Sequence, residues 1–395
     1  MKKVSVPSLL LMIVLLGFPQ ISETIFTPSL PDIAKSLSVS GSSIQLTLSV
    51  YFVGFAFGVF LIGWLSDRIG RRPAMLWGII IYGLGSLLCY FSKSIELLLV
   101  SRFIQALGAS AGSVVTQTIL RESVDGRKRH EMFAKIAGVI AFTPAVGPLI
   151  GGWIDQGFGF RAVFLTLVFM SVGIYMYTLT SLPETRTNQI ALNINVFHVL
   201  KRLLTNLKVI AFGLLIGGTN GILFSYYAEA PFIFMNYFNL SPGFYGFLGI
   251  VSALSSIIGA NISKQLLSRH EPERIIYFGC LVMSTGAIFL LITVLVGTTP
   301  NVYYAVAMLL SVFVLLLGIG IALPNCLSLA LVDFQQVIGT ASALFSLGYY
   351  LIVGGITWGM SSLHTGSLLI MPIYFLILVM VMTVICRVQI YTKKI

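Results

Sequence analysis

Long apolar stretches alternate with short polar ones along the whole of this 395-residue chain. A helix that crosses the hydrocarbon core of a bilayer needs about 20 mostly apolar residues, and twelve stretches reach that length. We predict that all of them are helices, because an open sheet edge would leave backbone groups without hydrogen bonds in lipid. The expected spans are roughly residues 8–28, 44–65, 74–91, 97–119, 132–153, 162–182, 208–234, 243–263, 275–296, 302–324, 337–360 and 367–387.

The longest polar interruption separates the sixth span from the seventh, between Pro183 and about Leu207. It divides the twelve spans into two sets of six. This pattern predicts an all-α membrane protein of two sets of six spans, residues 1–185 and 208–395, joined by a cytoplasmic linker at 186–207.

The composition excludes a soluble globular protein, because 57% of the residues are hydrophobic and 9% are charged. The net charge is +11, but its placement is uneven: 20 of the 24 Lys and Arg residues fall in the chain ends and loops of one side, against 3 in the opposite loops. Cytoplasmic loops carry the excess of Lys and Arg in membrane proteins. The count therefore predicts that both termini are cytoplasmic, and it accounts for the basic charge without a nucleic-acid partner.

Several kinds of chemistry lack the residues they need. No G-x-x-x-x-G-K-[ST] sequence occurs, so no ATP-binding loop is expected. The four cysteines lie in apolar stretches without a C-x-x-C pair, which favours buried thiols over a metal site or a disulfide. The four histidines lie outside the predicted spans, with His364 on the external side. We therefore expect no cofactor and no metal.

The segment after the second span has the order G-x-L-x-D-R-x-G-R-R-P over residues 63–73. A generic basic loop needs only the arginines, whereas this one also has two glycines and an aspartate at fixed offsets. The order resembles the loop between helices 2 and 3 of the major facilitator superfamily of secondary transporters, which implies the major facilitator fold, with the two sets of six spans as pseudo-symmetric six-helix bundles. The resemblance assigns these residues and one further acid to a cytoplasmic gate: Gly63, Asp67, Arg68, Gly70, Arg71, Arg72 and Glu122.

The superfamily scheme also implies which groups of this gate interact. Asp67 is expected to face the positive end of the helix dipole at the start of the eleventh span, near Gly339. Arg71 is expected to pair with Glu122 at the end of the fourth span. These contacts would hold the cytoplasmic side closed.

The fifth span contains G-P-x-x-G-G, which is similar to the motif that marks drug:proton antiporters within the superfamily. Proline removes a backbone donor and bends a helix, and glycines leave a thin face for packing. A plain kinked span is the alternative. The residues of this antiporter motif are Pro144, Gly147, Pro148, Gly151 and Gly152.

Glycines four residues apart occur in the second span, Gly54 and Gly58, and in the eleventh, Gly355 and Gly359. Small residues at this spacing let helix backbones approach closely. The superfamily resemblance implies that these two spans face each other across the two halves, although the abundance of glycine also explains such pairs.

Arg102 opens an R-x-x-Q-x-x-G sequence in the fourth span, with Gln105 as its glutamine, and this resembles another superfamily motif. An arginine inside a span costs about 2.5–3.5 kcal/mol on insertion scales, so such residues usually face a polar cavity. The alternative is that the side chain snorkels to the outer surface.

Two acids, Glu23 and Glu229, lie within predicted spans that occupy equivalent places in the two halves. Burial favours the neutral form of a carboxyl group, which can then carry a proton. We predict that proton coupling involves Glu23, Glu229 and Arg102, with Glu23 as the first choice of proton site and Glu229 as the second, or as a substrate contact near the outer mouth. An interfacial glutamate at a helix end is the alternative. Many members of the drug:proton antiporter branch that this chain resembles have an aspartate at the position of Thr24, one residue later.

Aromatic residues cluster on neighbouring spans, where they could line a cavity for flat or cationic compounds, or simply pack or face lipid. The predicted substrate cavity contains Tyr51, Phe55, Gln105, Tyr226 and Tyr227.

Nearly the whole chain, most clearly residues 20–165, resembles the Bcr/CflA-like branch of the drug:proton antiporters. Pro28–Ala34 and Arg161–Ala162 are among the stretches that carry this likeness. It implies a monomer in the lipid of the bacterial inner membrane that exports small drug-like compounds in exchange for protons, by alternating access and without enzymatic chemistry. Two alternatives stay open: an uptake symporter for a sugar or organic acid, and a membrane sensor or scaffold that does not transport.

Overall fold

Helices make up the regular structure of the described part of the chain. The structure is a computed structural model that describes residues 7–123, 132, 135–136, 138–186, 195–297 and 299–391. Within these residues no strand occurs, and twelve helical segments are long and apolar enough to span a bilayer. The predicted all-α membrane fold of twelve spans is confirmed.

The elements of the first half are α1 (Leu9–Thr24), the short 3₁₀ helix η1 (Thr27–Ser29), α2 (Leu30–Leu37), α3 (Gly41–Ile69), α4 (Arg71–Phe91), α5 (Ile95–Ser123), α7 (Thr143–Phe158) and α8 (Phe160–Ser181). The first span is longer than the predicted one, which ended at residue 28. Pro28 and Pro31 do not stop the helical path, because each stands at the first or second position of a new helix, where proline is tolerated.

The second half begins with α9 (Val196–Thr205), which lies inside the predicted linker. Its spans are built from α10 (Leu207–Pro231), the π-helical turn η2 (Phe232–Tyr237), α11 (Pro242–Phe247), α12 (Gly249–Leu266), α13 (Pro272–Val296), α14 (Val302–Leu329), the 3₁₀ helix η3 (Val332–Val337), α15 (Ile338–Leu363), α16 (Ile370–Ile385) and the π-helical turn η4 (Cys386–Tyr391).

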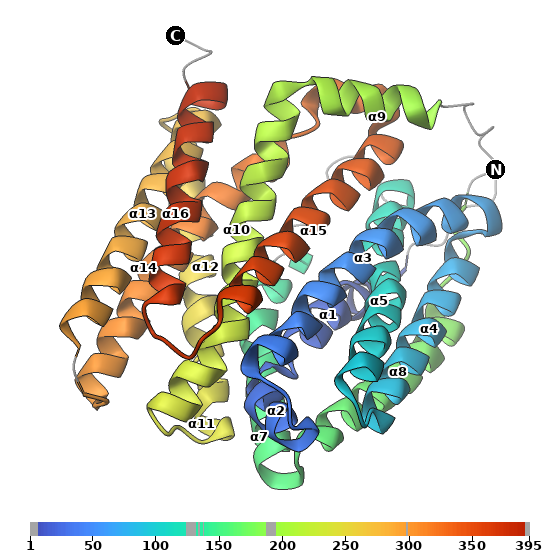
Figure 1. Cartoon of the computed structure of the whole chain (residues 1–395). Coiled ribbons are helices and arrows are strands. Elements are labelled where there is room, and N and C mark those ends of the chain that lie inside the picture. The colour runs from blue at the N-terminus through green and yellow to red at the C-terminus, as the bar shows by residue number, and fades with distance from the viewer. Residues whose placement is uncertain are drawn as a thin grey trace.

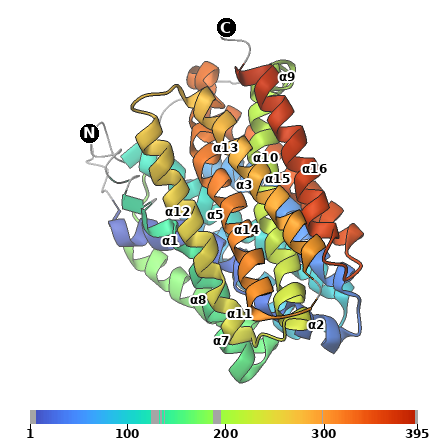
Figure 2. The ribbon, with the colours of Figure 1, turned by 90° about the vertical axis from the view of Figure 1, so that its left-hand side faces the viewer.

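The helices form two groups that lie side by side (Figure 1). One group holds α1 to α8 and the other α10 to α16, and both chain ends lie at the same end of the molecule. A view turned by 90° shows α12, α13 and α14 on the outer side of the second group (Figure 2). The helix α9 lies across the end of the molecule that carries the termini.

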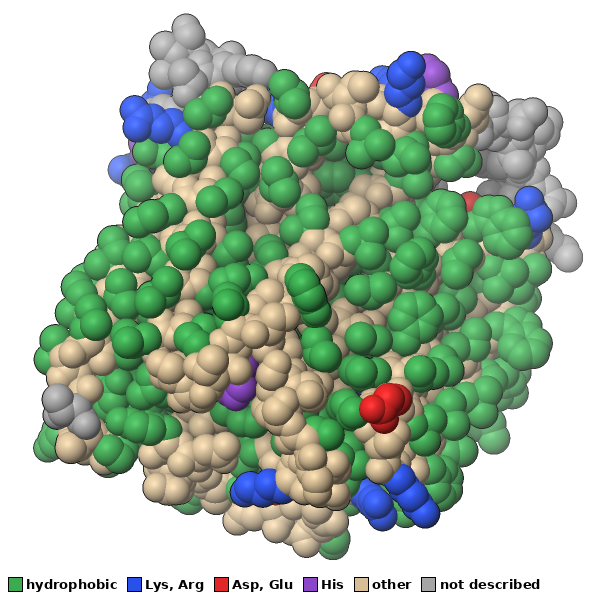
Figure 3. Space-filling model, viewed as in Figure 1, with side chains coloured by type: hydrophobic (Ala, Val, Ile, Leu, Met, Phe, Trp, Pro, Cys, Tyr) green, Lys and Arg blue, Asp and Glu red, His purple; other side chains and the backbone are tan. Residues whose placement is uncertain are grey.

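Hydrophobic side chains cover most of the visible face between the two ends, and Lys and Arg side chains stand near those ends (Figure 3). Exposed Trp, Phe and Leu side chains on nearly every span contribute to this surface. Such a belt matches the hydrocarbon region of a bilayer, with charged groups left at the water.

The two groups of helices make close contact where α3 crosses α15. A Cβ added at Gly354 would lie 3.0 Å from the side chain of Val53 and 3.3 Å from the carbonyl oxygen of Ser49. Gly354 therefore lets α15 pack directly against the backbone of α3.

The predicted glycine pairs serve other contacts. Gly54 and Gly58 face α5, where an added Cβ would overlap the backbone of Phe103 or Leu107. Gly355 has no atom within 4 Å of an added Cβ, and Gly359 faces Tyr374 on α16. The expectation that the second and eleventh spans face each other across the halves is confirmed, because α3 and α15 pack together, but Gly354 rather than the two glycine pairs forms the close contact.

Candidate functional site

A cavity of about 230 Å³ lies between the two groups of helices. Residues of α1, α3, α5, α7, α10 and α15 line it, so both halves contribute. The polar lining residues are Gln20, Glu23, Thr24, Ser113, Gln117 and Asn220, and the aromatic ones are Phe55, Phe224, Tyr227 and Tyr350. Glu23 is the only Asp, Glu, Lys, Arg or His side chain in this described lining.

Glu23 stands one residue before the end of α1 and is buried, with 6% of its surface exposed. The local structure around it is held by hydrogen bonds: the Thr24 hydroxyl donates to the backbone carbonyl of Gln20 at 3.1 Å, and the Thr143 hydroxyl of α7 donates to the Gln20 side chain. The last turn of α1 is therefore tied both to itself and to α7, which positions the Glu23 carboxyl group in the cavity wall.

The structure brings together only part of the predicted cavity. Phe55 and Tyr227 line it, whereas Tyr51, Gln105 and Tyr226 are buried elsewhere in the helix packing. The lining residues Gln20, Ser113, Gln117, Asn220 and Tyr350 were not predicted, because a single polar or aromatic residue in an apolar span gives no sign of the direction it faces.

Arg102 is wholly buried among the helices of the first half. Its guanidinium carbon lies 3.9 Å from the centre of the Phe26 ring and 4.2 Å from that of Tyr51, distances typical of cation–π contacts. It also donates to the Gln105 side-chain oxygen, and Gln105 donates in turn to the Ser86 hydroxyl at 2.8 Å. Arg102 therefore neither snorkels to the surface nor lines the cavity, and its part in proton coupling stays a prediction.

The antiporter motif places α7 against the end of α1. A Cβ added at Gly147 would overlap the side chain of Thr24, and one at Gly151 would overlap the carbonyl oxygen of Ile25. A Cβ added at Gly152, the residue after Gly151, would overlap the backbone of Pro242 in the second half. The motif therefore packs α7 against both the end of α1 that carries Glu23 and α11 of the second half. Its Pro144 also lines the cavity.

A cluster of three polar side chains joins the halves at the end of the molecule opposite the termini. The Gln45 amide nitrogen donates to Glu229 Oε2 at 2.7 Å, and His364 Nδ1 lies 2.8 Å and 3.0 Å from the two oxygens of Glu229. We name Gln45, Glu229 and His364 the outer latch. Glu229 is 3% exposed, and an added Cβ at Gly41 would come within 2.5 Å of His364 Nε2, so only a glycine admits the imidazole at that point.

A second pair of residues closes the same end. The Ser42 hydroxyl donates to the backbone carbonyl of Ser361 at 2.7 Å, and the Ser361 hydroxyl donates to that of Ser42 at 2.6 Å. The backbone nitrogen of Gly243 also donates to the Gln156 side chain at 2.9 Å. These hydrogen bonds join the two halves at this end, so the structure shows the molecule closed there.

The pairing predicted for Arg71 is confirmed. Its Nη2 lies 2.6 Å from Glu122 Oε1, and its Nε donates to Glu122 Oε2 at 3.0 Å. Its Nη1 lies 2.5 Å from Asp67 Oδ1, so Arg71 is also the partner of Asp67 in this structure. Among the described residues Asp67 makes its ion pair with Arg71 and no hydrogen bond to the start of α15, so the contact expected near Gly339 is not made in this structure.

The rest of the gate motif supports the turn between α3 and α4. Gly70 has a φ of 105°, a conformation that favours glycine, and the Glu184 carboxylate accepts from the backbone nitrogens of Arg71 and Arg72 at 3.0 Å and 3.1 Å. The Arg68 guanidinium lies 3.9 Å from the Trp64 ring. These contacts lie within the first half and its outgoing segment, so they brace this turn.

Comparisons with known proteins identify the family. The chain matches the Major Facilitator Superfamily over residues 12–357, and it belongs to that superfamily of transporters. Two curated relatives are an "Uncharacterized transporter" of Rickettsia bellii (strain RML369-C), 32% identical over 91% of this chain and 90% of the relative, and the "Chloramphenicol resistance protein" of Pseudomonas aeruginosa, 29% identical over 85% and 77%.

A third relative is the "Multidrug resistance protein MdtL" of Shewanella oneidensis, which is 27% identical over 86% of this chain and 84% of its own length. Among solved structures, a D-xylose-proton symporter matches with a TM-score of 0.75 over 95% of this chain and 96% of that one. At 16% identity this likeness shows the fold alone. The chain is a multi-pass membrane transporter with the major facilitator fold.

Proposed function

We propose that this transporter exports small cationic or amphiphilic drug-like compounds in exchange for protons, as a Bcr/CflA-like drug:proton antiporter. The observation that carries the proposal is the central cavity, where the Glu23 carboxyl group lies among the rings of Phe55, Phe224, Tyr227 and Tyr350. Aromatic faces attract organic cations, and a carboxylate adds a full negative charge. Two of the relatives carry names that refer to drug resistance, which supports the same class of substrate.

Exchange would follow from competition for one carboxyl group. A proton and a cationic compound cannot both neutralise Glu23, so binding of one expels the other. Alternating access would then load a proton on one side of the membrane and the drug on the other. The cavity volume of about 230 Å³ is below the 300–1,000 Å³ usual for drug-sized ligands, so a cavity of this size suits a small compound or part of a larger one.

The proposed orientation places both termini in the cytoplasm of a bacterium and the outer latch on the external side. It rests on the count of Lys and Arg residues, of which 20 fall on the side of the membrane that carries the two termini and 3 on the opposite side. In this orientation the structure is closed to the outside. We expect the protein to work as a monomer surrounded by lipid, since each half of the cavity comes from the same chain.

A second candidate function, uptake of a polar neutral solute with protons, is favoured by one observation. Three side-chain amides, Gln20, Gln117 and Asn220, line the cavity together with Glu23. Amides supply both donors and acceptors for hydroxyl groups. A sugar or a similar hydroxylated compound would use these contacts rather than the aromatic faces.

The deciding experiment measures proton movement in inside-out vesicles that contain this chain. A pH-sensitive dye reports a respiration-driven gradient, and lipophilic cations, neutral drugs and sugars are added in turn. Export by exchange predicts that a cation discharges the gradient, and that overexpression raises the inhibitory concentration of the same cation several-fold. If no cation discharges the gradient, and a sugar added to intact cells instead draws protons in from the medium, uptake replaces export; no response to any compound would favour a sensor or scaffold.

A further inference from the structure

The helix α9 has an apolar side that is wider than the surface the protein offers to it. With about 100° between successive residues of a helix, six apolar side chains fall on one continuous arc that covers roughly half of the circumference. In order around the helix they are Val199, Leu203, Val196, Leu200, Leu204 and Phe197. The opposite arc holds Lys201, Thr205, His198 and Arg202. A helix so divided belongs at a boundary between apolar and aqueous surroundings.

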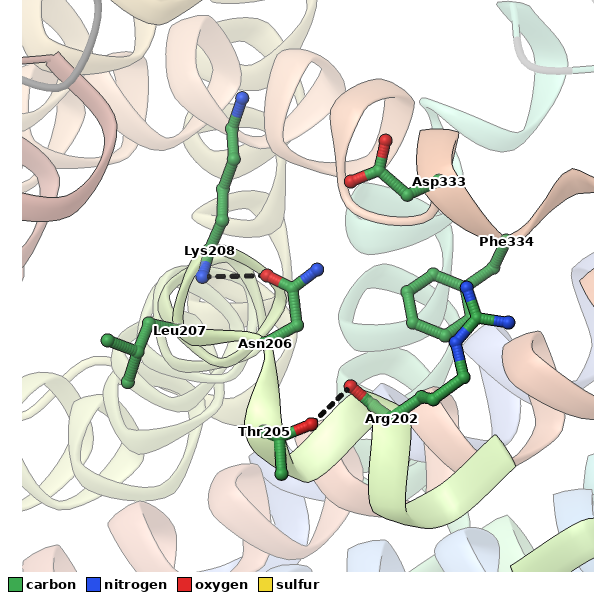
Figure 4. A pocket seen from close by; sticks show the side chains of 7 residues that line it. All are labelled: Arg202, Thr205, Asn206, Leu207, Lys208, Asp333 and Phe334. Atoms are coloured by element: carbon green, nitrogen blue, oxygen red, sulfur yellow. Dashed lines mark hydrogen bonds between the residues drawn. The ribbon is translucent and has the colours of Figure 1, made fainter. Parts of the chain in front are cut away.

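One edge of the apolar arc is covered by the second half of the protein. Val199 and Leu203 are buried and pack in a cluster with Phe334, Ala341 and Leu344 of η3 and α15. Next to them the Arg202 guanidinium stacks 4.9 Å from the centre of the Phe334 ring. Figure 4 shows Arg202 against this ring, while Lys208 points away from it. This edge of α9 therefore fastens the helix to the start of α15.

The other edge of the arc has no cover in the described part of the chain. Phe197 is 74% exposed, Leu204 is 64% exposed and Val196 is 45% exposed. Phe197 and Leu204 lie on the side of the helix away from Val199, so the contact with α15 cannot reach them, and Val196 lies between the two edges of the arc. Hydrophobic side chains continue from the belt of the spans up to the end of the molecule where α9 lies, with basic side chains beyond them (Figure 3).

We propose that α9 is an interfacial helix whose exposed apolar edge is immersed in the bilayer leaflet on the side of the termini. The neighbours of α9 argue for this occupant: the spans beside it are long and apolar enough to cross a bilayer, and α9 lies across their ends, where the headgroup region would be. Lys201 follows Phe197 and Leu204 around the helix, so its long side chain can reach outward to the phosphate of an anionic phospholipid. In this arrangement one edge of α9 packs against α15 and the other edge is covered by lipid.

The test uses the full chain in nanodiscs with an environment-sensitive fluorophore on one introduced cysteine. Cys89, Cys280, Cys326 and Cys386 are buried, so they leave the exposed introduced position as the reactive one. The probe is placed by Leu204→Cys on the apolar edge and by Thr205→Cys on the polar side, a matched control at the same level of the helix. A Phe197→Cys probe reads the apolar edge independently of position 204.

Lipids with brominated acyl chains quench a fluorophore only when it lies among them. We expect quenching at positions 197 and 204 to be at least threefold stronger than at 205. Replacing part of the neutral lipid by phosphatidylglycerol should strengthen quenching at 204, and Lys201→Gln should remove that increase. Equal quenching at 204 and 205, or energy transfer between probes on two copies of the chain, would overturn the proposal, because the edge would then face water or a second copy.

Discussion

At the scale of single residues, Glu23 is the group on which proton exchange depends in the proposed mechanism. We expect Glu23→Gln to insert normally but to lose substrate-induced proton release. A side-chain amide does not bind a proton near neutral pH, and it carries no charge with which to bind a cation. Proton release from the detergent-solubilised protein on addition of substrate measures this directly. Glu96→Gln removes an exposed glutamate and should release as many protons as the unchanged protein. Full release from the Glu23 variant would move the proton site to Glu229 or to Asp32.

The outer latch supports a second prediction at the same scale. A hydrogen bond to a charged group contributes about 1.5–3 kcal/mol, so losing the imidazole should raise the population open to the outside by about tenfold or more. We expect His364→Ala to speed the reaction of a cysteine introduced at the cavity residue Asn220 with an impermeant thiol reagent added outside. His270→Ala, in an exposed turn, is the control. An unchanged rate in the His364 variant would show that the latch does not control access.

Glu229 shows why the structure adds to a residue-level prediction. Glu229 was predicted from the sequence as an acid within a span, whereas His364 was placed on the external side, outside the spans. The structure joins them, since His364 follows the last residue of α15 and its Nδ1 reaches the carboxylate. We therefore expect Glu229 to act first in external closure, and the proposed contact with substrate remains secondary.

At the scale of elements, the packing of α7 on the end of α1 depends on the absence of a side chain. A Cβ at Gly151 would overlap a backbone carbonyl, which cannot move without shifting α1. We expect Gly151→Ala to destabilise the protein by about 1–3 kcal/mol, the usual cost of overpacking, and to slow transport. Thermal unfolding in detergent and drug export measure the two effects.

Gly157 provides the matched control on the same helix. It is exposed, it has no atom within 4 Å of an added Cβ, and alanine is the better helix former by about 1 kcal/mol. We expect Gly157→Ala to leave transport unchanged and stability equal or higher. Equal behaviour of the two variants would show that the close approach of α7 to α1 has no role.

The turn between α3 and α4 supports a prediction about the gate. Asp67 is 70% exposed although it pairs with Arg71, so it can leave that partner when the ends of the halves approach. We expect Asp67→Asn to abolish transport and to leave the protein in the membrane, because Glu122 keeps Arg71 in place while the mobile charge is lost. Asp333→Asn, an exposed acid of η3, should retain export. Normal export by the Asp67 variant would exclude this residue from the gate.

At the scale of the whole molecule, the orientation in the membrane is testable with the same thiol chemistry. Ser367, between α15 and α16, and Ser268, between α12 and α13, are both exposed. We expect Ser367→Cys to react with an impermeant reagent in intact cells, and Ser268→Cys to react only after the membrane is permeabilised. The reverse pattern would invert the proposed topology and place the outer latch in the cytoplasm.

The sequence alone determined the features that depend on local composition. The length of an apolar stretch decides whether it spans a bilayer, so the twelve spans were predicted and confirmed. The pairing of Arg71 with Glu122 was also predicted, because the order of residues around Arg71 resembles a known motif. Glu23 was selected as an acid that lipid cannot accommodate, and the structure places it in the cavity wall.

Only the tertiary structure decided which residues from different spans meet. A helix that is apolar on every side has no periodic pattern from which its rotation about its own axis can be read. For that reason Tyr51 and Gln105 were expected in a cavity and lie around Arg102, whereas Gln45 and His364, which are 184 and 135 positions from Glu229 in the chain, were not expected to bind it. Their contacts depend on how two bundles pack, and that packing is set by many weak interactions over the whole molecule.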